Sequence, residues 1–262
     1  EIQKREDEKS QFNLFHPTPK RLMRDFNTDR PDKTETPYTV DAGHFQYEAD
    51  LIHYFYDRAE DGTLSQLWTF NSMNLKVGLI RQMDMQLIVP TYNVLSVSSA
   101  SSSYRGYADT FLRLKFNLVG NDGGAVAFGV MPFIKFPTSV SGLGLRSYDG
   151  GVIFPFALSL PGEWSAGLMF VYSKARDDTD GNYHSEFISS WTLSHALPAH
   201  LDGYVEIFSR SSNEAGATWL ATFDFGLVYS ASKDVKIDAG ANVGLTPAAI
   251  DYDPFIGLSF RI

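Results

Sequence analysis

Charged side chains alternate with apolar ones in several segments of this 262-residue chain. Residues 106–124 are the clearest case, because Arg113 and Lys115 alternate there with Leu112, Leu114 and Phe116. Successive side chains of a β-strand point to opposite faces, so one face of such a strand is charged and the other apolar. A charged face can bind ions or polar solutes and can set up an electric field across a pore.

The two signs of charge are separated along the sequence. The basic residues of the alternating segments come mainly from the first half, whereas the acidic ones come mainly from the second half and from the first segment. On a closed sheet, this order would place a basic wall opposite an acidic wall and would orient polar solutes at a constriction. The alternative is that these residues are paired and solvated space-fillers. The predicted lumen and constriction residues are Glu48, Asp50, Lys76, Asp84, Arg113, Lys115, Lys135, Glu186, Glu206, Asp224 and Asp238.

About twelve segments between residues 43 and 262 repeat the alternation. A tilted strand needs about 9 to 11 residues to cross a bilayer, and these segments are close to that length. Strands of soluble proteins average about 5 to 6 residues. The connections alternate between short and long, as in outer-membrane barrels. The short ones are predicted at 81–83, 121–124, 161–162, 197–199 and 230–233, and the longest at 91–107 and 137–149. The prediction is an all-β fold, a transmembrane antiparallel up-and-down β-barrel of about twelve strands, in the bacterial outer membrane with both termini periplasmic.

Residues 1–42 do not follow the alternation and form a separate segment before the barrel of residues 43–262. Four prolines between residues 17 and 37 cannot donate a backbone hydrogen bond, so this segment is predicted to be irregular, with a short helix near Lys20 to Asp25. This segment is either a flexible leader or a plug held against or inside the barrel mouth. We favour the plug, because exposed apolar side chains are costly in water. The predicted anchors are Leu14, Phe15, Leu22, Met23 and Phe26.

The composition limits the partners and the chemistry. A net charge of −9 argues against nucleic acid, because phosphate binding needs clustered lysines and arginines. The chain has no cysteine, which excludes disulfides and thiolate sites. The first residues, E-I-Q-K-R-E-D-E-K, are too charged for the core of a signal peptide, so we expect any export signal to have been removed.

Other candidate sites do not meet the requirements of their chemistry. The loop from Asp177 to Asn182 resembles a calcium loop in composition, but it lacks the EF-hand spacing and has Ser189 where the bidentate glutamate belongs. A solvated acidic loop is the favoured interpretation, and weak divalent binding the alternative. Ser194 and His195 are strand neighbours that point oppositely, so they cannot form a dyad. We therefore predict no catalytic residue, no resident metal and no cofactor.

Two stretches resemble a known family. They are N-T-D-R-P-D-K-T-E-T-P-Y-T-V-D-A-G-H-F-Q-Y-E at residues 27–48 and L-K-F-N-L-V-G-N-D-G-G at residues 114–124. Both resemble the outer-membrane channels called the MetA-pathway of phenol degradation or putative transporter family. The resemblance implies a monomeric channel for small, often aromatic or hydrophobic compounds, without catalytic residues. The expected partners are the lipid bilayer and lipopolysaccharide, a small-molecule solute and, during biogenesis, the barrel assembly machinery.

The resulting hypothesis is a passive outer-membrane channel for small hydrophobic or aromatic compounds. Eight strands leave room for side chains alone and about 16 to 18 leave an open channel, so twelve predict a narrow pore. A strand break near Pro132 or Pro155 would open the wall to the bilayer. One alternative is a narrow porin for saccharides or nucleosides. Another is a soluble β-sandwich that acts as a binding module.

Overall fold

The computed structural model describes residues 7–59, 61–99, 102–177 and 181–262. In this part of the chain, antiparallel strands form a single sheet. The strands are β1 (Phe45–Arg58), β2 (Leu64–Ile80), β3 (Met83–Val97), β4 (Ser102–Gly106), β5 (Thr110–Val119), β6 (Val126–Phe136), β7 (Asp149–Ser159), β8 (Trp164–Arg176), β9 (Tyr183–Leu197), β10 (Leu201–Ser212), β11 (Leu220–Ser232), β12 (Val235–Gly244) and β13 (Tyr252–Arg261).

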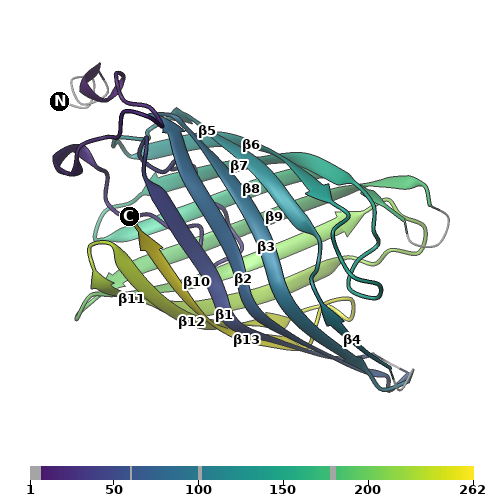
Figure 1. Ribbon diagram of the computed structural model, residues 1–262. Helices are drawn as coiled ribbons and strands as arrows, with labels where there is room; N and C mark the ends of the chain where they lie inside the picture. The colour runs from purple at the N-terminus through teal and green to yellow at the C-terminus, as the bar shows by residue number, and fades with distance from the viewer. Residues whose placement is uncertain (1–6, 60, 100–101, 178–180) are drawn as a thin grey trace.

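The sheet closes on itself (Figure 1). Each wall strand pairs with the next, and the pairing of β1 with both β2 and β13 completes a ring of twelve strands in the described residues. The short β4 lies outside the ring and pairs with β3 alone. The predicted twelve-strand barrel is therefore confirmed. The β-sandwich alternative is wrong, because a sandwich consists of two open sheets.

The connections alternate in length around the ring. Two residues join β2 to β3, and two join β11 to β12, whereas longer segments join β6 to β7 and β12 to β13. The first described residues and the C-terminus lie at the end of the barrel with the short turns (Figure 1), where Arg261 N–H donates to the Asp234 carbonyl. One predicted loop was wrong: in region 91–107, β3 continues to Val97 and β4 folds back onto it, which extends the wall beyond the ring.

The two faces of the sheet differ in polarity. On β2, outward Leu75 is 40% exposed, whereas its inward neighbour Lys76 is 4% exposed. The same alternation places Leu87 outside on β3 and Lys115 inside on β5, where Lys115 is 1% exposed. An apolar outer surface around a polar lumen is the distribution found in barrels embedded in lipid. Within the described residues, no helix has the length and apolarity needed to cross a bilayer.

The N-terminal segment is irregular, as predicted. The helix expected near Lys20 to Asp25 is a single 3₁₀ turn, Lys20–Leu22. Leu22 packs with Phe12 and Ala42 in a small buried cluster near the end with the short turns. The first strand of the wall starts at Phe45, so the residues before it are not part of the barrel wall.

Candidate functional site

A stretch of the N-terminal segment, residues 27–41, lies inside the barrel, and we call it the plug. Its backbone and side chains bond to inward-facing groups around most of the ring, on β1, β2, β3, β5, β9, β10, β11 and β12. A segment that reaches so many separate strands must cross the lumen. The prolines that prevent it from joining the sheet leave its amides and carbonyls available for these contacts.

Asp29 is the most highly connected plug residue. Its carboxylate accepts hydrogen bonds from Lys76 on β2 and from Lys115 on β5, with Lys115 Nζ 2.6 Å from Oδ1. The Asp29 backbone N–H donates to Glu48 Oε2 at 3.0 Å. Burial alone would raise the pKa of Asp29, but the ammonium groups of Lys115 and Lys76 outweigh it and hold this pKa well below its usual range. Asp29 therefore stays ionised and neutralises the basic wall.

Arg30 makes the complementary contact with the acidic wall. Its guanidinium bridges Asp50 on β1 and Asp238 on β12, with N–O distances of 2.5 Å and 2.6 Å. Gly257 on β13 lies under this group, since a Cβ there would stand 2.1 Å from Arg30 Nη2. The bare backbone of Gly257 thus lets the guanidinium lie flat against the wall between its two carboxylates.

Lys33 and Thr34 continue the plug toward the second half of the barrel. The Lys33 backbone N–H donates to Glu206 at 2.9 Å, and its ammonium group lies 3.1 Å from Asp224 Oδ2. The Thr34 hydroxyl lies 2.6 Å from Ser190 Oγ and donates to Glu206. The plug thus offers N–H and O–H donors to the acidic strands.

The structure brings most of the predicted lumen residues together around the plug. The charge separation exists on the strands, but plug side chains of opposite sign neutralise much of it. Arg113 pairs with Glu35, and Asp84 accepts the Val40 N–H at 2.9 Å. Two predicted residues lie away from this network: Lys135 pairs with Asp109 and Asp149, and Glu186 lies beside His184 and Arg210.

The sequence analysis missed the plug's own charges. The run Asp29-Arg-Pro-Asp-Lys-Thr-Glu35 carries five of them in seven residues. Such density in a segment without strand alternation is a signal that could have identified a lumenal partner for the charged strand faces.

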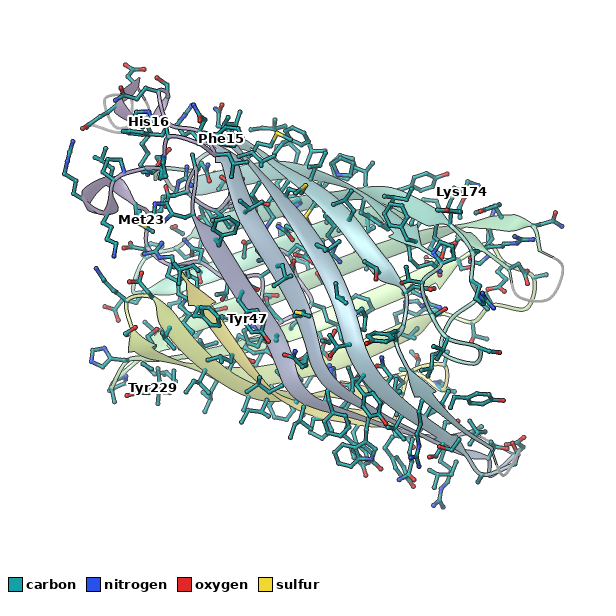
Figure 2. The ribbon with its side chains drawn as sticks, viewed as in Figure 1. Phe15, His16, Met23, Tyr47, Lys174 and Tyr229 are labelled. Carbon is teal, nitrogen blue, oxygen red and sulfur yellow. The ribbon has the colours of Figure 1, made fainter. Side chains whose placement is uncertain are left out.

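The predicted apolar anchors account for part of the attachment. Leu22 and Phe26 are buried and Leu14 and Met23 partly buried. Phe15 was predicted wrongly, because it is 92% exposed beside the short-turn end, where Figure 2 labels it. It lies two positions after Asn13, which forms an isolated β-bridge with Ile80 at the tip of β2.

Ion pairs hold the rest of the segment at this end. Lys9 is buried and lies 2.6 Å from Asp122 and 3.3 Å from Asp41. The Arg24 guanidinium also lies 3.0 Å from Asp122. The anchorage is therefore as much ionic as apolar.

Asp32 is expected to oppose plug docking at neutral pH. Burial and the neighbouring Glu206 carboxylate raise its pKa well above the usual range. A carboxyl with a raised pKa in the docked state weakens docking as the pH rises above its undocked value of about 3.9. Asp32→Asn should therefore lower hydrogen exchange of residues 27–41 at least about tenfold at pH 7, with little change near pH 3, where the carboxyl is protonated in both states. Equal exchange in both proteins at pH 7 would contradict this assignment.

The plug divides the lumen into separate cavities. The cavity on the long-loop side measures about 590 Å³ and has Lys33, Glu35 and Arg113 at its plug end. One wall is apolar, although it faces the lumen. This wall consists of Ile153, Met169 and Val171 with Phe133 and Ile188, and the fully buried Met131 packs in the same cluster. A second cavity of about 380 Å³ lies between the plug and β7 to β10.

Comparison with known proteins places the barrel and the plug in one family. A family model described as the putative MetA-pathway of phenol degradation matches residues 28–262. The chain belongs to this family. The match confirms the resemblance inferred from residues 27–48 and 114–124.

Solved structures share the barrel of this family member. An outer-membrane channel from Pseudomonas putida F1 superposes with a TM-score of 0.62 at 12% identity, over 90% of this chain and 98% of that chain. The NanC porin gives a TM-score of 0.54 at 8% identity, over 83% of this chain and 100% of that chain. At such identities the likeness shows the fold. No curated protein sequence matches the chain.

In this family member, the barrel strands next to the apolar cavity wall are incompletely paired. Within the described sheet, residues 131–132 of β6 have no paired partner on β5, and residues 129–130 have none on β7. Pro132 on β6 and Pro155 on β7 lie in these gaps, and neither has an amide to donate. β6 is thus unpaired on both edges next to Met131.

Proposed function

We propose that this protein is an outer-membrane channel for the passive diffusion of small molecules, with a preference for small hydrophobic or aromatic compounds. The barrel supports the channel, because its apolar exterior and polar lumen suit a lipid-embedded pore. The short turns and both chain ends face the periplasm and the long connections face outward, as in other outer-membrane barrels. A monomeric state and contacts with lipopolysaccharide and the assembly machinery stay predictions.

The apolar wall of the 590 Å³ cavity carries the proposed solute class. Small-molecule sites of about 300 to 1,000 Å³ combine mostly apolar walls with a few polar groups that orient the ligand. Here Arg113 and Lys135 lie at the rim of the apolar surface, where they can donate hydrogen bonds to the hydroxyl oxygen of a phenol-like solute. Most of the rest of the cavity lining is polar and includes Lys135, Glu186 and Arg210. A porin for saccharides or nucleosides, the alternative from the sequence, would carry hydrogen-bonding groups on the apolar wall as well.

A matched pair of variants at Ile153 tests the solute class. Ile153 is 4% exposed and belongs to the apolar wall. Ile153→Thr and Ile153→Val have nearly the same shape, but threonine places a hydroxyl against the solute, which costs about 1 kcal/mol or more. We expect half-saturation of phenol flux into proteoliposomes to rise roughly fivefold in the threonine variant relative to the valine variant, with arabinose flux unchanged. Equal phenol flux in the two variants would reject an apolar solute site.

We also propose that such solutes leave sideways into the bilayer through the gap at β6. Val130 and Phe154 would face each other across the unpaired part of the β6–β7 ladder. Cysteines at both positions should form a disulfide that closes this gap, sharply lowering phenol flux and leaving arabinose flux unchanged. Reduction should restore the flux. Phenol transport that is the same in the oxidised and reduced protein would show that the solute takes another path.

A further inference from the structure

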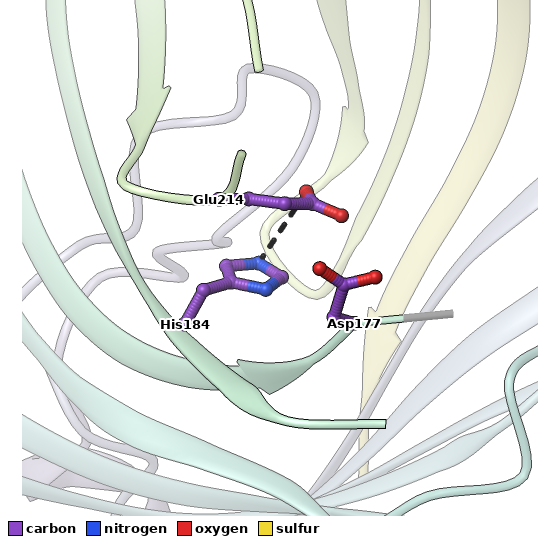
Figure 3. Close-up of side chains that lie close together, drawn as sticks. All are labelled: Asp177, His184 and Glu214. Atoms are coloured by element: carbon purple, nitrogen blue, oxygen red, sulfur yellow. Dashed lines mark ion pairs between the residues drawn. The ribbon is translucent and has the colours of Figure 1, made fainter. Parts of the chain in front are cut away.

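Three potential metal ligands converge where β8, β9 and β10 end or begin at the long-loop side. Asp177 follows β8, His184 is the second residue of β9, and Glu214 follows β10. One ligand atom from each lies within 4.8 Å of the others. Figure 3 shows both carboxylates beside the nitrogen-bearing edge of the imidazole ring. This cluster lies beyond the plug network, and His184 and Glu214 also line the 590 Å³ cavity at its long-loop end.

The backbone around these residues is held in place. Asp177 N–H donates to the Asn182 carbonyl at 2.8 Å, which closes the turn between the two strands. Ser185 N–H donates to Asn213 Oδ1 at 2.6 Å, and Asn213 N–H returns a bond to the Ser185 carbonyl. The positions next to His184 and Glu214 are therefore joined to each other. The three side chains converge without any rearrangement of the barrel.

The His184 imidazole has a buried nitrogen whose hydrogen-bonding capacity is unsatisfied among the described residues. The His184 side chain is 10% exposed, and its buried Nδ1 has no hydrogen-bond partner in the described part of the chain. Its Nε2 lies 3.8 Å from Glu214 Oε2 and 3.7 Å from Glu186 Oε1. These distances exceed a hydrogen bond. They match the spacing of about 3 to 4 Å between two ligands that each lie about 2.0 to 2.2 Å from one ion.

We propose that Asp177, His184 and Glu214 form a binding site for a divalent transition-metal ion of the zinc class at the outer mouth of the barrel. An imidazole with carboxylates suits zinc and its neighbours, whereas calcium takes oxygen ligands. Glu186 adds negative charge nearby, but its Oε1 already lies 3.5 Å from Arg210 Nε, so three protein ligands hold the ion and water completes its coordination. The bound ion joins the ends of β8, β9 and β10 above the apolar-walled cavity.

Calorimetric titration of the metal-free, detergent-folded full chain with zinc chloride tests the site. We expect one zinc ion per chain, with affinity at least about tenfold weaker in His184→Ala and in Glu214→Gln. His200→Ala is the matched control, because His200 is exposed in the short β9–β10 turn at the opposite end, and its affinity should equal that of the wild type. Calcium chloride should give no binding isotherm.

Thermal unfolding provides a second readout. Zinc should raise the unfolding temperature of the wild type and of His200→Ala, but not of His184→Ala or Glu214→Gln, because an ion that binds the folded state stabilises it. Slower migration after boiling would confirm that each variant was folded beforehand. Wild-type zinc affinity in both ligand variants, or no zinc binding by the wild type, would overturn the site. Neither outcome depends on solute flux, so the proposed channel function is tested separately.

Discussion

Removal of residues 1–41 should convert a nearly closed barrel into an open pore, with a single-channel conductance roughly tenfold above that of the full chain. The plug spans the lumen and bonds to strands on opposite sides, from Lys76 on β2 to Asp238 on β12. Without it, the space between these walls fills with water and ions. Planar-bilayer recording of the two proteins measures the difference.

The truncated barrel should also show the charge asymmetry that the plug neutralises. With Asp29 and Glu35 removed, Lys115 and Arg113 face water and should bias permeation toward anions on their side of the pore. Arg113→Ala with Lys115→Ala should therefore shift the reversal potential in the truncated barrel and much less in the full chain.

Migration in unboiled gels checks that the truncated barrel is folded. An unchanged conductance after truncation would mean that the plug does not block the pore.

Asp29→Asn should undock the plug while leaving the barrel intact. The substitution removes the carboxylate that both Lys76 and Lys115 contact and leaves Glu48 as the remaining partner of Lys76 in this cluster. Breaking a buried ion pair from one side costs about 3–5 kcal/mol, so the undocked fraction should rise by a factor of about a hundred to several thousand. Protease cleavage within residues 27–41, which tracks the undocked population, measures this rise.

Acidification should reproduce the effect of this substitution. The pKa of Asp29 is depressed in the docked plug, so the ionised carboxylate stabilises docking fully at pH values above the ordinary carboxyl range. This stabilisation is lost as the pH falls through the depressed pKa. For the substitution, Asp25→Asn is the matched control, since Asp25 is exposed on the same N-terminal segment. Equal cleavage rates of Asp29→Asn and Asp25→Asn would show that the ion pairs of Asp29 with Lys76 and Lys115 do not hold the plug in place.

Local sequence patterns were sufficient to predict the wall of this protein. Alternation along segments such as Leu112 to Phe116 specifies both a strand and the face that meets lipid, because side-chain direction in a strand depends on nothing beyond the neighbouring residue. The parity of loop lengths predicted which connections share one end of the barrel. The extra strand β4 was missed, because the serine-rich region 91–107 has no clear alternation and its pairing depends on β3.

The interior could not be predicted in this way. Arg30 meets Asp238, 208 positions later, because closure of the ring brings β12 close to β1, with β13 alone between them, and both face the plug. Asp177, His184 and Glu214 converge because three neighbouring strands end together. Such contacts join residues whose separation in the sequence carries no information about their distance in space. Sequence patterns therefore determined which side chains are charged and which way they point, whereas barrel closure decided which charges meet.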